Sequence, residues 1–222
     1  MHPRASRGAA LACASLVYGL LALPSHGSAC LHVVEFTKDD AVAAVARADR
    51  LVGEGRAREA YRVALRARHR LEEHMRSVRR DSSTTAVIRR AQLVSAVAIV
   101  RLGGHTPVSY RTARRHVMRG RSERSLEWAL ERLQERAREA PSDLRVRAQL
   151  AEAMSYFPDL RPEAERILRD LMDRDLMPDA HGYAALTRIT SPGSEAWNTA
   201  LSRCATMAGE HRDAICPNAS QS

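Results

Sequence analysis

Two cysteines and a histidine near the C-terminus are the residues of this chain best placed to do chemistry. Cys204 and Cys216 are close in sequence, and His211 lies between them. A cysteine becomes a nucleophile when a nearby base such as histidine takes its proton, so this cluster would suit an α-helical enzyme or an enzyme accessory. The same cysteines could instead form a structural disulfide that holds the C-terminal segment against the last helix. We favour the disulfide.

The stretch HRLEEH, residues 69–74, is the second candidate, as a zinc site. Zinc motifs of the His-Glu-x-x-His kind place both histidines on one face of a helix, with the acid beside them. His69 and His74 are five residues apart, which separates them by about 140° at roughly 100° per residue. The spacing misses the motif, so we expect solvent-facing histidines and no bound metal.

The remaining motifs of catalysis are not found in the sequence. It contains no Gly-rich phosphate loop, no G-x-S-x-G elbow and no C-x-x-C pair. We therefore expect neither catalysis nor a cofactor.

The basic composition does not by itself indicate a nucleic-acid partner. The formal net charge is +9, and Lys38 is the only lysine. Arginines alternate with acids, as in RLEEHMRSVRRD, which is typical of solvated helix faces. Only two Trp and two Phe are available to stack on bases. We expect no nucleic-acid partner, whereas attraction to an anionic envelope surface is compatible with the charge.

Residues 1–29 have the order of a secretory signal peptide. They comprise a basic start, an apolar run and a small-residue cleavage site, carried by Arg4 and Arg7, by residues 8–23, and by Gly27 with Ala29. The alternative is an uncleaved membrane anchor, but the apolar run is shorter than the roughly 20 residues that a spanning helix needs. We predict an exported protein of the bacterial periplasm, cell envelope or exterior. Cleavage removes two arginines and no acids, which lowers the formal charge to +7.

Cys30 would be the first residue after this cleavage. The stretch before it resembles the cleavage motif of bacterial lipoproteins, although Gly27 stands where that family usually has leucine and His26 is also atypical. The resemblance implies a lipid on Cys30 and hence membrane attachment. Alternatively, Cys30 pairs with Cys204 or Cys216, because an odd cysteine in an exported protein requires a partner or a modification.

The rest of the chain is predicted to be all-α. Residues 30–37, with LHVVEF, are expected to form a short extended N-terminal segment. After it, apolar residues recur at helical spacing, and Gly, Pro and capping residues separate the segments. We predict helices at residues 38–52, 56–76, 84–102, 107–119, 122–139, 142–156, 161–175, 179–190 and 194–210.

Paired helices of this size, joined by short turns, resemble tetratricopeptide repeats, whose period is about 34 residues. The resemblance is carried by small residues where two helices cross and by large residues beside them. These are Ala48, Leu51, Ala60 and Ala67 in the first hairpin, and Leu150, Ala151, Met154, Ala164, Leu168 and Leu171 in a later one. Two helices that cross closely need small side chains at the crossing.

The resemblance implies a right-handed solenoid of stacked antiparallel helical hairpins over residues 38–212, with a C-terminal tail at 213–222. A compact helical bundle, which uses the same alanines for ordinary packing, is the alternative. Stacked hairpins leave a concave surface that binds partners. We therefore predict an exported scaffold or adaptor for protein–protein interaction, whose partner is a protein or peptide. The candidate partner contacts are Arg50, Arg58, Tyr61, Arg145 and Arg147.

Overall fold

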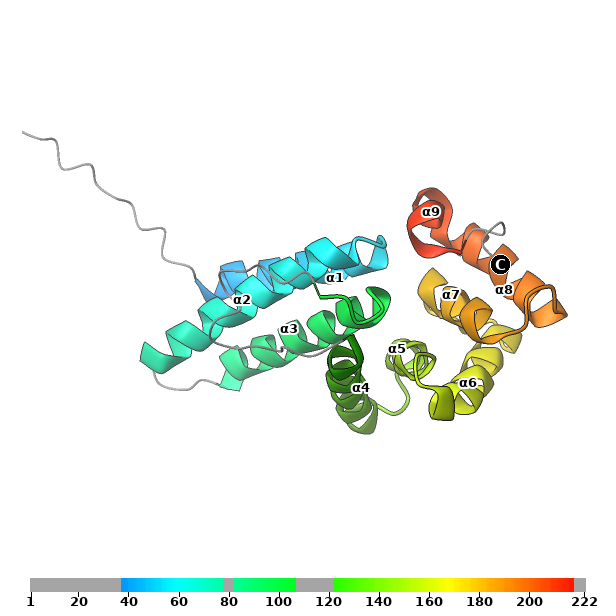
Figure 1. Ribbon diagram of the computed structural model, residues 1–222. Coiled ribbons are helices and arrows are strands. Elements are labelled where there is room, and N and C mark those ends of the chain that lie inside the picture. Colours follow the sequence, from blue (N-terminus) through cyan, green and yellow to red (C-terminus); the bar gives the residue numbers. More distant parts are fainter. Residues whose placement is uncertain (1–36, 78–81, 107–121, 218–222) are drawn as a thin grey trace, which may run out of the picture. The chain divides into compact units, whose positions relative to one another are not determined.

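The computed structural model describes residues 37–77, 82–106 and 122–217, and all the regular structure in these ranges is helical (Figure 1). The helices are α1 (Lys38–Gly53), α2 (Ala57–Ser77), α3 (Ser82–Arg101), α4 (Ser122–Glu139), α5 (Leu144–Met154), α6 (Arg161–Asp173), α7 (Ala180–Ile189), α8 (Glu195–Ala208) and α9 (Arg212–Ile215), with short 3-10 turns at Pro158–Leu160 and Gly209–His211. The predicted all-α fold is confirmed. The predicted signal peptide, Cys30 and the predicted helix 107–119 lie outside the described residues.

Four helices, α1, α5, α7 and α8, begin where a short polar side chain accepts hydrogen bonds from the first free backbone N–H groups. Thr37 caps α1 in a reciprocal capping box with Asp40, as its sequence position predicts. The side chains of Asp143 and Asp179 accept from backbone N–H groups at the starts of α5 and α7, so these helices start at residues 144 and 180 rather than at 142 and 179. No helix within the described ranges is both long and apolar enough to cross a membrane.

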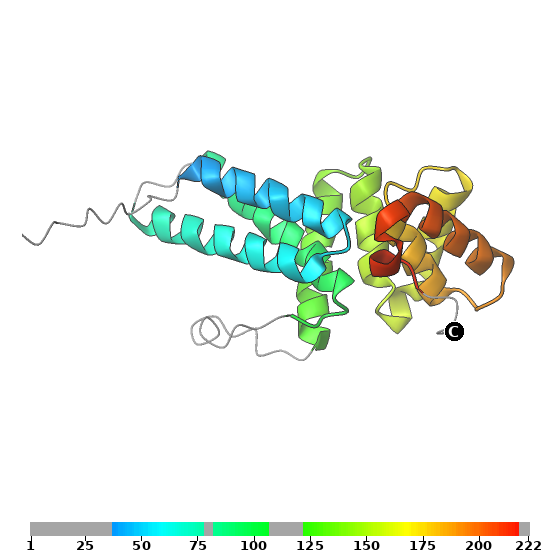
Figure 2. The same cartoon turned by 90° about the horizontal axis from the view of Figure 1, so that it is seen from above.

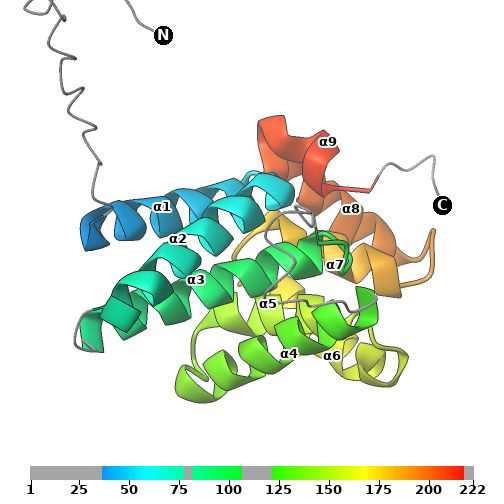
Figure 3. The ribbon, with the colours of Figure 1, turned by 60° about the vertical axis from the view of Figure 1, so that its left-hand side comes forward.

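The helices pack in a regular order. Each helix from α1 to α8 contacts the next one along the chain, and each odd-numbered helix also contacts the next odd-numbered helix. The contacts of the second kind are α1 with α3, α3 with α5, α5 with α7, and α7 with α9. Figures 2 and 3 show the beginning of this order, with α1, α2 and α3 side by side.

Alanines are fully buried where α1 and α2 pack together, and larger side chains there would hold the helices apart. Ala48 of α1 and Ala60 and Ala64 of α2 are fully buried in one apolar cluster. Of the residues that carry the repeat resemblance, all are buried except Leu150, which is partly buried. The small residues of α2 therefore allow a close helix crossing.

The interior consists of two apolar clusters that share neighbours. One is built mainly from α1 to α4 and the other from α5 to α9. Leu130 of α4 and Leu150 of α5 pack against both clusters, so the helices of the two clusters are in continuous apolar contact.

The C-terminal helix α9 lies against the turn between α1 and α2, a contact that the sequence does not reveal. Gly55 in this turn has a φ of +77°, and a β-carbon there would lie 2.9 Å from the Cβ of Ala214 and 3.0 Å from the Cγ1 of Ile215. Residues 213–215, predicted as part of a tail, thus belong to a helix that contacts the first hairpin.

We expect Gly55→Ala to destabilise the protein more than Gly193→Ala. Both glycines have positive φ, at +77° and +80°, which costs an alanine about 1–2 kcal/mol. Only at Gly55 does the new β-carbon also collide with α9, since Gly193 faces open space, and overpacking adds about 1–3 kcal/mol. Urea unfolding followed by circular dichroism measures both losses. Equal losses in the two variants would show that α9 does not press on the turn.

Candidate functional site

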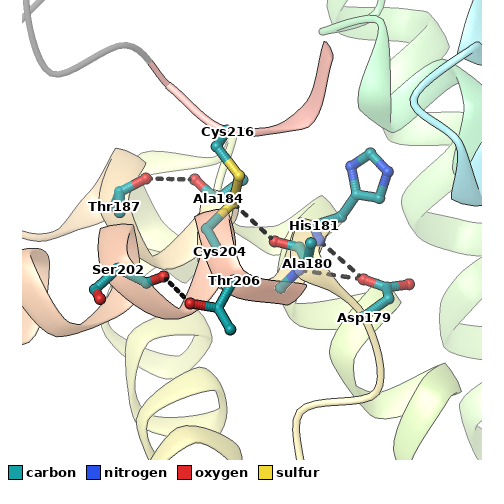
Figure 4. Close-up of a disulfide and its surroundings, with 10 residues drawn as sticks. Asp179, Ala180, His181, Ala184, Thr187, Ser202, Cys204, Thr206 and Cys216 are labelled. Carbon is teal, nitrogen blue, oxygen red and sulfur yellow. Dashed lines mark hydrogen bonds between the residues drawn. A yellow bond between two sulfur atoms is a disulfide. The ribbon is translucent and has the colours of Figure 1, made fainter. Parts of the chain in front are cut away.

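The cysteine cluster that suggested nucleophilic chemistry is a disulfide. Cys204 and Cys216 are joined by an S–S bond of 2.08 Å and both are buried (Figure 4). His211 lies 3.6 Å from Glu210, measured between Nε2 and Oε1. Because each sulfur is bonded to the other, neither has a thiol to activate. The Sγ of Cys204 also lies 3.5 Å from the carbonyl oxygen of Ala180, which is a packing contact, since the sulfur has no hydrogen to donate.

The histidines of HRLEEH do not form a metal site with their neighbours. His69 is exposed and pairs with Glu73 one turn along α2, with 3.4 Å between Nδ1 and Oε1. The side chain of His74 lies outside the described residues. In the part of the chain that the structure describes, no group of three His, Cys, Asp or Glu side chains is arranged to hold a metal ion.

A groove of about 550 Å³ between α1, α3, α4 and α5 is a candidate binding site. Its wall is apolar along α3 and at the start of α5, where it is formed by Leu93, Val94, Val97 and Val146. Charged side chains surround this wall: Asp49, Arg89, Arg90, Arg132, Glu135, Arg136, Glu139, Asp143 and Arg145. The groove thus combines a small apolar wall with many charged side chains, and it is more polar than most sites for small molecules.

Ion pairs between helices order the charged border of the groove. Asp49 of α1 accepts hydrogen bonds from Arg145 of α5 at 3.0 Å and from Arg90 of α3 at 3.5 Å. Within α4, Arg132 and Arg136 pair with glutamates one turn away. Arg89 is exposed and has no ion-pair partner among the described residues. Arg89 and the outer part of Arg90 are therefore the cations most available to a bound molecule.

A buried ionic cluster lies one helical turn beyond the groove on the same helices. Arg101 of α3 and Glu152 of α5 are each only 3% exposed, and their side chains approach within 3.3 Å. Arg101 also donates to Asp179, the capping residue of α7, at 3.1 Å and to the carbonyl oxygen of Val52 of α1 at 2.9 Å. One guanidinium thus joins the ends of α1, α3, α5 and α7.

His181 completes this cluster from the first turn of α7. Its Nε2 lies 3.2 Å from the same carbonyl oxygen of Val52, so Nε2 carries the proton and donates it. Figure 4 shows the imidazole pointing away from the disulfide. Burial and then the charge of Arg101 hold the pKa of His181 below its ordinary value. His181 is therefore neutral at pH 7.

Arg101 and Asp179 each favour the charged form of the other. Burial works against both charged forms, but Glu152 and Asp179 raise the pKa of Arg101, and Arg101 lowers the pKa of Asp179. A buried charge that is paired and hydrogen-bonded in this way holds its helices in one arrangement. We assign the cluster a structural role.

The predicted partner contacts do not gather in one place. Arg145 lines the groove, whereas Arg147 pairs with Asp170 of α6 at 3.4 Å. Arg50 and Arg58 are exposed, and Tyr61 is partly buried against the first apolar cluster. Burial raises the pKa of the Tyr61 hydroxyl.

Sequence reasoning missed the groove arginines of α3 and the whole Arg101 cluster. Arg101 is 51 residues from Glu152 and 78 from Asp179, so no local pattern links them. The usable signals were local ones: Asp179 stands at a helix start, and Arg101 follows the apolar run VSAVAIV at the end of α3.

Comparison of the chain with protein-family models, with curated proteins and with solved structures finds no match. Its function must therefore be argued from the groove, the cluster and the surface.

We expect Arg101→Met to lower the free energy of unfolding by about 3–5 kcal/mol, because it leaves buried Glu152 unpaired. The double variant Arg101→Met, Glu152→Met should lose less, since it removes both buried charges. Arg136→Met removes a half-exposed ion pair on α4 and should cost less than about 1 kcal/mol. Denaturant unfolding of the three variants is the measurement. An Arg101→Met loss no larger than that of Arg136→Met would contradict the role of the cluster.

Acid should weaken the contribution of His181 to stability. Its folded pKa lies below the ordinary histidine value of about 6.5, so below about pH 6.5 the unfolded chain binds more protons at this site than the folded chain. The contribution is therefore complete above pH 6.5 and is lost as the pH falls toward the folded pKa. We expect the difference in unfolding free energy between the wild type and His181→Gln to shrink from pH 7 to pH 5. A difference that stays constant over this range would refute the expectation.

Proposed function

We propose that the protein is an exported helical-repeat scaffold, a right-handed solenoid of tetratricopeptide-like hairpins, that binds a protein or peptide in the groove between α1, α3, α4 and α5. The observation that carries the proposal is the packing order, in which each odd-numbered helix contacts the next odd-numbered helix. Stacked hairpins produce this order because the first helix of each pair packs on the first helix of the next pair.

The positions of the small residues support the hairpin assignment. Ala48 of α1 and Ala60 of α2 are buried in one cluster, and Ala151 of α5 and Ala164 of α6 are buried in the other. These are the residues that carry the resemblance to tetratricopeptide repeats. Their burial at equivalent places in two hairpins is what a repeated unit requires, although an alanine-rich bundle would also bury them.

The chemistry of the groove favours a peptide segment with an apolar side chain and neighbouring acids. Leu93 offers a partly exposed apolar side chain, with Val94, Val97 and Val146 buried behind it, and Arg89 and Arg90 offer exposed guanidinium groups beside it. Guanidinium groups bind carboxylates through two parallel hydrogen bonds, which orients the segment as well as holding it. Burial of the segment's apolar side chain supplies affinity, and the arginines fix the position of the segment along the groove.

Export is supported by the sequence order of residues 1–29 and by the Cys204–Cys216 disulfide. Disulfides persist in oxidising compartments such as the bacterial periplasm. We place the scaffold in the periplasm, at the cell envelope or outside the cell, with Cys30 as the candidate site for a lipid that attaches it to a membrane.

Site-specific photocrosslinking tests the groove as the partner site. A photoreactive amino acid at Ala86, an exposed groove residue, should yield a discrete crosslinked product in cells that make the protein naturally. The same group at Met207, exposed on α8 outside the groove, should not yield that product. Adding Arg89→Glu and Arg90→Glu to the Ala86 probe should reduce the product at least about tenfold, because carboxylates would then repel an acidic segment.

The matched control for this charge reversal is Arg166→Glu with Arg169→Glu on α6, which changes the net charge equally at a site away from the groove. The α6 control should keep the crosslink. Crosslinks that form equally from Ala86 and Met207, or that respond equally to both charge reversals, would refute the groove as the partner site.

A further inference from the structure

Three arginines form an exposed row on α2. Arg58, Arg62 and Arg66 follow one another at a spacing of four residues, so they lie along one face of the helix over about 12 Å. All three are exposed, and none has an ion-pair partner among the described residues. The buried stripe Ala60, Ala64, Ala67 and Leu71 lies on the opposite side of α2. The arginine row, defined as these three residues, therefore faces away from α1 and α3.

The arginines of α6 show what an ordinary solvated face looks like in this protein. Arg166 pairs with Glu163 and Arg169 with Glu165, each within one turn of the helix, and Arg174, the C-cap of α6, pairs with Asp170. Arg132 and Arg136 on α4 follow the same rule. Pairing within the helix is thus available to this chain, and the arginine row of α2 departs from it.

Local physics gives no folding reason for the row. Like charges four residues apart repel one another along a helix. Arg58 is also the second residue of α2, where the positive end of the helix dipole disfavours a cation. Arg50, by contrast, lies in the last turn of α1, where the dipole favours it. The acids of α2 are already engaged: Glu59 pairs with Arg47 and Arg56, Glu72 with Arg68, and Glu73 with His69.

We propose that the arginine row binds the anionic surface of a phospholipid bilayer. The row is straight and lies on the outward face of a helix, so it suits a flat array of phosphate groups better than a single peptide. The described side chain that could stack on a base nearby, Tyr61, is partly buried, which disfavours single-stranded nucleic acid. Each arginine at such a surface strengthens binding about fivefold.

This surface is separate from the groove of the proposed partner site, which is lined by α1, α3, α4 and α5 and not by α2. The inference therefore goes beyond the scaffold function and does not depend on it. If Cys30 carries a lipid, the row would act as a second attachment, since lipid chains and basic patches reinforce each other at a membrane.

Vesicle cosedimentation of the purified full chain tests the proposal. We expect binding to vesicles of phosphatidylglycerol mixed with phosphatidylcholine, weaker binding to pure phosphatidylcholine, and a decrease with added salt. The triple variant Arg58→Gln, Arg62→Gln, Arg66→Gln should bind the anionic vesicles about a hundredfold more weakly. Glutamine is a good helix former, so α2 should remain folded, and thermal unfolding followed by circular dichroism checks this.

The control variant Arg166→Gln, Arg169→Gln, Arg174→Gln removes the same charge from α6 and its C-cap and leaves residues 1–36 unchanged, so it should retain binding within a few-fold. Equal losses in the two triple variants would show that net charge alone attracts the protein, and would overturn the proposal. Equal binding to anionic and neutral vesicles would also overturn it. So would a triple variant of α2 that loses binding to a single-stranded RNA oligonucleotide but keeps its binding to anionic vesicles.

Discussion

The buried charge of Arg101 is the interaction on which the arrangement of these helices depends. A guanidinium that is 3% exposed must find its partners inside the protein. It finds them on three other helices, in the carbonyl oxygen of Val52, the carboxylate of Glu152 and the capping carboxylate of Asp179. Such a cluster adds little to stability compared with apolar packing, but any shift of one helix leaves a charge unpaired. The cluster therefore mainly fixes the positions of α1, α3, α5 and α7 relative to one another.

The turn after α1 is held from two sides by contacts that reinforce this arrangement of the helices. The carbonyl oxygen of Val52 accepts from Arg101 and lies within hydrogen-bond distance of His181. Three residues later, Gly55 contacts α9, and the disulfide at Cys216 ties the end of α9 to α8. A helix of four residues cannot hold itself together in water, so α9 depends on these attachments. The first hairpin and the last helices thus constrain each other although they are far apart in sequence.

The sequence predicts the helices well because their signals are local. Apolar spacing, Thr37 at the start of α1 and the glycines after it are all read within a few residues. The disulfide was predicted because its cysteines are close together. The Arg101 cluster was not, since its members look like ordinary charged residues until chain segments 51 and 78 residues away come together. The groove was only partly predicted: Arg145 carries no local mark that distinguishes it from Arg147, which faces α6 instead.

Pairing, rather than composition, separates the roles of the arginines in this chain. Arg101 is buried among oxygen atoms from three helices, a geometry that suits a planar guanidinium with five donors and does not suit an ammonium. Arg166 and Arg169 are paired within their own helix and serve as solvated surface. The arginine row of α2 is neither buried nor paired, although the alanine stripe on the opposite face packs as closely as elsewhere in the core. Burial explains the first kind and pairing the second, whereas neither accounts for the arginine row of α2 or for Arg89 at the groove.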